Sequence, residues 1–145
     1  MKAIQQQIEI NWPVKALFNY VSDLSNNADW QRQVVNAEWI GMEKNRSGAQ
    51  FKETRKIFGR QLCATVEVTE FQLYKKRSFT FLNGPIRPEL TMEFEPHGEN
   101  TVMKLTIAVR AKGFMRLVEG VMARHVTREG YNDLVRLKQL LETSN

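Results

Sequence analysis

Apolar and polar side chains alternate along residues 3–10, and the apolar members are Ile4, Ile8 and Ile10. This period of two predicts a half-buried β-strand. The sequence Asn11-Trp12-Pro13 ends the strand, and Pro13 suits the first position of a helix. Apolar residues then recur at helical spacing up to Val21, which predicts a short helix, and residues 25–30 are expected to add another turn or two.

Between residues 34 and 111 the pattern returns to strands, which short turn signals separate. The signals are Asn45-Arg46-Ser47-Gly48, Phe58-Gly59, Tyr74-Lys75, Asn83-Gly84-Pro85 and Pro96-His97-Gly98-Glu99-Asn100. Connections this short predict antiparallel neighbours. Alternation is clearest in Leu62/Ala64/Val66/Val68, Phe79/Phe81, Leu90/Met92/Phe94 and Met103/Leu105/Ile107/Val109. We therefore expect a sheet with one apolar face and one solvated face.

The chain from Gly113 to about Glu142 has no proline, and about 29 residues make a helix about 43 Å long. Its second half has an inner line of Val126, Gly130, Leu134, Leu137 and Leu141. Its first half has a stripe, rotated by about a third of a turn, of Phe114, Leu117, Val118, Val121 and Met122. Either the helix bends near Gly130, or a loop or second subunit covers its first half on a further side.

These elements predict one α+β domain over residues 1–145: a curved antiparallel sheet of about seven strands wrapped round a long C-terminal helix, with two short helices after the first strand. Small residues on the helix, Ala123 and Gly130, would leave room for a ligand over the sheet. The expected lining is Phe51, Leu62, Ala64, Val66, Phe79, Phe81, Leu90, Met92, Phe94 and Leu105 from the sheet, with Met122, Ala123, Val126 and Gly130 from the helix. The alternative, that these side chains simply pack together, predicts the same alternation.

Three polar residues interrupt the apolar face if these strand registers hold: Gln6, Glu53 and Arg55. A buried charge is costly unless it is paired, so such groups either bridge each other or meet a polar part of a ligand. Arg55 would then anchor a carboxylate, phenolate or enolate, and Glu53 would act as a base if burial raised its pKa. In the alternative, strand 50–57 is shifted by one residue and both side chains are solvated. His125, on the helix, is a further candidate because histidine titrates near neutrality.

Composition narrows the function classes. Basic residues outnumber acidic ones by 21 to 16 without forming a block, so we expect no nucleic-acid partner. No apolar run approaches the about 20 residues that span a bilayer, and the start of the chain lacks a signal peptide, which favours a cytoplasmic protein. The single Cys63 and two isolated histidines offer no metal-ligand spacing, and phosphate-loop, dinucleotide and nucleophile motifs are absent. We therefore expect no metal and no cofactor.

The order of elements resembles the START-like helix-grip superfamily, also called SRPBCC, along essentially the whole chain. The opening Pro13-Val14-x-x-Leu17-Phe18-x-x-Val21-Ser22-Asp23-Leu24, followed by Trp30, resembles the bacterial polyketide cyclase/dehydrase-like proteins. Later positions are similar to the same group. They are Gly48 before Phe51, then Gly59, Val66 and Glu70 before a Phe-rich strand, and the closing Leu134-x-x-Leu137-Lys138-x-x-Leu141-Glu142. The resemblance implies a cavity but not its occupant, because relatives include cyclases, lipid carriers, coenzyme Q-binding proteins and hormone receptors.

Three functions are compatible with these observations. The first is binding of an apolar small molecule such as a lipid, isoprenoid or polyketide-like aromatic. The second is a cyclase, aromatase or dehydratase in which Arg55 stabilises oxyanion charge while Glu53 or His125 moves protons. The third is an interaction module, such as a homodimer, formed through Phe114, Leu117 and Val121.

Overall fold

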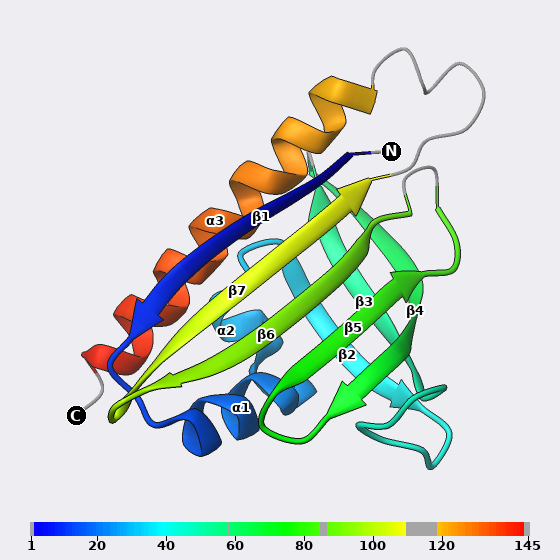
Figure 1. Cartoon of the computed structure of the whole chain (residues 1–145). Helices are drawn as coiled ribbons and strands as arrows, with labels where there is room; N and C mark the ends of the chain where they lie inside the picture. Colours follow the sequence, from blue (N-terminus) through cyan, green and yellow to red (C-terminus); the bar gives the residue numbers. More distant parts are fainter. Residues whose placement is uncertain (1, 58, 85–86, 110–118, 144–145) are drawn as a thin grey trace.

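The structure is a computed structural model that describes residues 2–57, 59–84, 87–109 and 119–143. Its elements follow the predicted order (Figure 1). They are β1 (Lys2–Ile10), α1 (Val14–Ser22), the 3-10 turn η1 (Leu24–Asn26), α2 (Asn27–Trp30), β2 (Val34–Ile40), β3 (Gln50–Ile57), β4 (Arg60–Gln72), β5 (Lys76–Phe81), β6 (Glu89–His97), β7 (Asn100–Val109) and α3 (Glu119–Glu142).

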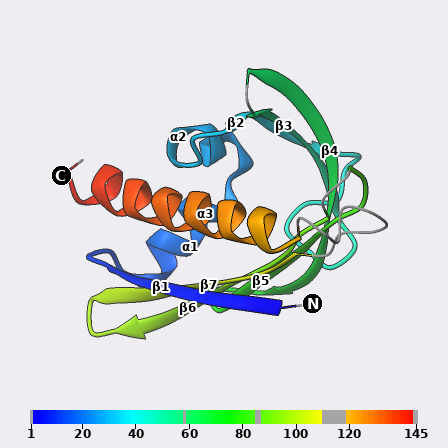
Figure 2. The same ribbon diagram turned by 90° about the horizontal axis from the view of Figure 1, so that it is seen from above.

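The seven strands form one antiparallel sheet in the order β1-β7-β6-β5-β4-β3-β2. Consecutive strands from β2 to β7 are neighbours in this sheet, and β1 lies at the other edge, paired with β7. Register shifts between Val34 and Asn36 and between Val68 and Glu70 bend the sheet, since a bulge increases local twist. Figure 2 shows the sheet curving from β1 on one side of α3 round to β2 on the other. The predicted helix-grip architecture is confirmed.

The core lies between the concave face and the helices. Leu134, Leu137 and Leu141, which the sequence placed on one line of the C-terminal helix, are 0–2% exposed and press α3 onto β1 and β7. Phe18 of α1 is 1% exposed and belongs to this core. Its ring makes edge-to-face contacts with Phe71, Tyr74 and Phe94, at centroid distances of 5.5, 5.7 and 5.0 Å.

Gly130 brings α3 close to the sheet. A Cβ at this position would lie 2.9 Å from Ile107 Cδ1 and 3.1 Å from Leu105 Cδ2, both on β7. Our expectation that Gly130 leaves room for a ligand is therefore wrong: side chains of β7 already fill that space. α3 runs as one helix from Glu119 to Glu142 and passes through Gly130 without a break (Figure 2).

The first half of the C-terminal helix is described only from Glu119 onward. The predicted stripe members Phe114, Leu117 and Val118 lie outside the described residues, as does the side chain of Met122. Val121 is 64% exposed. Among the helices in the described part of the chain, none combines the length and apolarity that crossing a bilayer requires.

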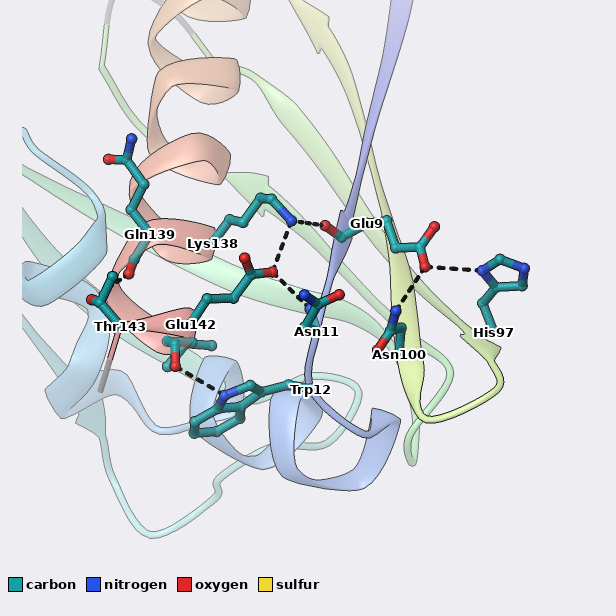
Figure 3. A network of polar contacts seen from close by, with 10 residues as sticks. Glu9, Asn11, Trp12, His97, Asn100, Lys138, Gln139, Glu142 and Thr143 are labelled. Atoms are coloured by element: carbon teal, nitrogen blue, oxygen red, sulfur yellow. Dashed lines mark hydrogen bonds and ion pairs between the residues drawn. The ribbon is translucent and has the colours of Figure 1, made fainter. Parts of the chain in front are cut away.

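Polar contacts fasten the end of α3 to the start of the chain (Figure 3). Lys138 Nζ donates to the backbone carbonyl of Glu9 and to Glu142 Oε2, each at 2.7 Å. Glu142 Oε2 also accepts from the backbone N–H of Asn11 at 2.8 Å, and the Trp12 indole donates to the carbonyl of Leu141 at 3.0 Å. The C-terminal half of α3 is thereby held at a fixed place across the sheet.

Candidate functional site

A small cavity lies between the concave face of β3–β6 and the η1–α2 segment. Its volume is about 30 Å³, and its lining is Leu24, Asn27, Gln31, Phe51, Glu53, Arg55, Val66, Arg77, Phe79, Phe81, Leu90 and Met92. Cross-strand pairing assembles this wall, since Phe51 lies opposite Val66, Val66 opposite Phe81, and Phe79 opposite Leu90. Phe51 and Phe79 also meet edge to face at 5.8 Å.

Six of the predicted apolar wall residues line this cavity: Phe51, Val66, Phe79, Phe81, Leu90 and Met92. The others lie elsewhere. Phe94 and Leu105 are buried in the core, Leu62 is 49% exposed and Ala64 is partly buried beyond the cavity, and Ala123, Val126 and Gly130 lie on α3 outside the lining. His125, also on α3, is partly buried and outside it as well.

The size of the cavity limits what it holds without rearrangement. A space of about 30 Å³ accommodates one or two water molecules, whereas drug-sized ligands occupy pockets of about 300–1,000 Å³. The alternative in which side chains pack together therefore describes most of the concave face. Any ligand larger than a few atoms has to displace part of the wall.

Glu53 and Arg55 form an ion pair at this wall. Glu53 is only 3% exposed, and Arg55 Nε donates to its Oε1, while Arg55 Nη2 donates to Gln31 Oε1 at 3.0 Å. Of the two registers left open by the sequence, the unshifted one is present. The pair satisfies the buried carboxylate, which burial alone would make costly. Gln6 is placed differently: its Oε1 is buried beside α3 near Gly130.

Arg77 is a polar residue of the lining that the sequence reasoning missed. It is 3% exposed, its Nη1 donates to the carbonyl of Val21 at 3.1 Å, and its Cζ lies 4.7 Å from the centre of the Phe79 ring. Burial lowers the pKa of Arg77 to about 9, so the guanidinium keeps its charge at neutral pH. The alternation along β5 indicates this position, because Arg77, Phe79 and Phe81 are alternate residues and therefore point to the same face of the sheet.

Asp133 connects α3 with the segment after α2. It is 8% exposed and accepts the backbone N–H of Arg32 at 3.2 Å. Burial raises the pKa of Asp133 to about 6, although the Arg32 hydrogen bond and the charges of Arg55 and Arg136 lower it, and Glu129 raises it further. The carboxyl therefore binds its proton more tightly in the folded chain than in the unfolded one.

This difference predicts a pH dependence of stability. Between the unfolded pKa of about 4 and the folded value of about 6, the folded chain holds the proton that the unfolded chain has lost, so stability falls as pH rises. We expect wild type to lose about 2 kcal/mol relative to Asp133→Asn between pH 4 and pH 7, measured by urea unfolding. Asp29→Asn, at an exposed site on α2, is the control and should follow wild type. Parallel profiles for wild type and Asp133→Asn would contradict the burial argument.

A larger groove of about 640 Å³ opens on the surface between α1–η1 and β2. Its lining is mostly polar and includes Asp23, Ser25, Glu38, Lys44 and Asn45. Solvent already hydrates such groups, so an apolar ligand gains little by resting there. Leu24 is the residue that the linings of this groove and of the cavity have in common.

Comparisons with known proteins agree with this geometry. Residues 1–142 match the family described as polyketide cyclase / dehydrase and lipid transport. No curated protein matches the sequence.

Solved structures with the same fold include three of similar size. A protein from Thermus thermophilus has a TM-score of 0.81 at 19% identity, with 99% of this chain and 100% of that chain covered. A START superfamily protein from Mycobacterium smegmatis has a TM-score of 0.76 at 16% identity, with 96% of this chain and 98% of that chain covered. The Zhui aromatase/cyclase from Streptomyces sp. R1128 has a TM-score of 0.81 at 13% identity, with 97% of this chain and 93% of that chain covered. At these identities the likeness shows the fold alone.

Proposed function

Because the chain belongs to the polyketide cyclase / dehydrase and lipid transport family, we propose that it binds an apolar small molecule, such as a lipid, isoprenoid or polyketide-like aromatic. The site is the cavity under η1 and α2. The observation that carries this proposal is the composition of its wall, in which aromatic and aliphatic side chains surround a few buried polar groups. That combination is typical of small-molecule sites, where apolar surface supplies affinity and polar groups fix orientation.

Access to the cavity runs past Leu24. This side chain is 5% exposed and belongs to both the surface groove and the cavity. It lies in η1, a single 3-10 turn held by an Asp23 cap, which is a smaller unit to displace than any strand of the sheet. Displacement of Leu24 would open the cavity toward the surface groove and give a ligand a route to the apolar wall.

A pair of matched valines tests the proposal. Val66 and Val68 are both 1% exposed on β4, but only Val66 lines the cavity. Val66→Ile adds one methylene to the free space and should weaken binding of the test ligand 2-naphthamide about tenfold without loss of stability. Val68→Ile overpacks the closed core, so it should cost about 1 kcal/mol of stability and leave affinity unchanged.

Isothermal titration calorimetry measures the affinities, and urea unfolding measures the stabilities. Equal affinity in the two variants would place binding away from this cavity. Failure of wild type to bind 2-naphthamide would count against a site for compact aromatic ligands.

A second candidate function is proton-transfer chemistry of the cyclase or dehydratase type. It is favoured by one observation: Glu53 and Arg55, the proposed base and oxyanion partner, both line the cavity. Such a site should catalyse exchange of the methyl protons of acetophenone with solvent deuterium, followed by NMR. Exchange at the same rate with wild type, Glu53→Gln and no protein would eliminate this candidate.

A further inference from the structure

The guanidinium of Arg77 is fixed in position from two sides. Its Nη1 donates to the carbonyl of Val21, in the last turn of α1, where carbonyl groups lack partners within the helix. Its Cζ lies over the Phe79 ring, 4.7 Å from the ring centre. These contacts hold a long and otherwise mobile side chain in one orientation.

The opposite edge of the same guanidinium is unpaired. Nε and Nη2 are buried and have no hydrogen-bond partner among the residues that the structure describes. These two nitrogens share one edge of the planar group, and their N–H bonds run nearly parallel. That spacing matches the two oxygens of a carboxylate, which such an edge binds through two hydrogen bonds.

The neighbouring charges do not satisfy this edge. Glu53, the carboxylate in the cavity wall, accepts a hydrogen bond from Arg55, and Arg55 also donates to Gln31. Arg77 is therefore a buried cation in the wall without a carboxylate partner in the described chain, an arrangement that costs free energy unless something else supplies the acceptor.

We propose that Arg77 binds the carboxylate of an apolar carboxylic acid through its Nε–Nη2 edge, and that the cavity ligand belongs to this chemical class. The inference rests on the proposed small-molecule site. The existing space of about 30 Å³ suits a planar carboxylate better than a bulkier tetrahedral phosphate. The apolar remainder of the ligand then packs on Phe51, Phe79 and Met92 after the wall opens.

The test compares 2-naphthoate with 2-naphthamide, which have nearly the same shape and differ in charge. We expect wild type to bind 2-naphthoate at least about tenfold more tightly, because charge-assisted bidentate pairs are strong. Arg77→Met should abolish this preference, so that the variant no longer distinguishes 2-naphthoate from 2-naphthamide. Arg77→Lys, which retains the charge and can reach Val21 but lacks the paired edge, should keep only part of it. Arg32→Met removes a nearby exposed cation and should keep the full preference.

A readout on the unmodified protein covers the case in which the Arg77 variants do not fold. In a nitrogen–proton NMR spectrum of wild type, the Arg77 Nε–H proton signal should move downfield on addition of 2-naphthoate and clearly less on addition of 2-naphthamide, because a carboxylate accepts a stronger hydrogen bond than an amide oxygen. Equal affinity for the two compounds, or a preference that survives in Arg77→Met, overturns the role of Arg77 and leaves the proposed function intact. Binding of neither compound overturns the proposed site, and the inference with it.

Discussion

Arg55→Met is expected to lower the free energy of unfolding by about 3–4 kcal/mol, because it leaves the carboxylate of Glu53 buried without its cation. Glu53 is 3% exposed, and Arg55 is its only ion-pair partner among the residues described. Removing one member of a buried pair is costly since the desolvation of the remaining charge is no longer offset. The variant also loses the hydrogen bond from Arg55 to Gln31, which loosens α2 against β3.

Glu53→Gln provides the matched control. Its amide oxygen can still accept from Arg55, and the remaining cation has a side chain that is 22% exposed, so the cost should be only about 1 kcal/mol. The double variant should cost less than the sum of the two single variants, as coupled neighbours do. Urea unfolding of all four proteins measures this coupling, and strictly additive effects would show that the pair contributes nothing to the fold.

Gly130→Leu is expected to cost about 3 kcal/mol or more, because the new side chain has no space between α3 and β7. A single Cβ already comes within 2.9 Å of Ile107 and 3.1 Å of Leu105. Gly130→Ala should be close to neutral, since the small shift it demands of the two side-chain ends is offset by about 1 kcal/mol of helix propensity.

Gly120 serves as the control on the same helix. Among the residues that the structure describes, no atom lies within 4 Å of a Cβ built there, so Gly120→Leu should be neutral or slightly stabilising. Thermal and urea unfolding of the two leucine variants compare the sites directly. Equal stability of Gly130→Leu and Gly120→Leu would mean that α3 does not approach the sheet as closely as these distances require.

The fold could be predicted from the sequence because alternation and turn signals are local properties. The apolar face of the sheet follows from the period of two, and short turns leave antiparallel pairing as the available arrangement. The same parity argument places Glu53 and Arg55 on the concave face. Along β5 the same parity also places Arg77 on this face, because it lies two residues before Phe79 and four before Phe81.

The size of the site could not be predicted in this way. A glycine on the inner face of a helix is compatible with empty space or with close approach, and only the distance from Gly130 to β7 decides between them. Parity likewise places Leu62 on the concave side, opposite Arg55. It does not tell how far the covering helices extend, and Leu62 lies exposed beyond them. Such outcomes depend on side-chain packing between elements that are distant in sequence.

The most direct test of the central claim uses methionine methyl groups as reporters. Met92 lines the cavity, Met103 is 0% exposed in the core outside the cavity lining, and Met42 is 97% exposed. In a carbon–proton NMR titration with 2-naphthamide, our account predicts that the Met92 signal shifts in a saturable manner while those of Met103 and Met42 stay in place. An unmoved Met92 signal, with shifts at Met42 or with none at all, would contradict a small-molecule site in this cavity.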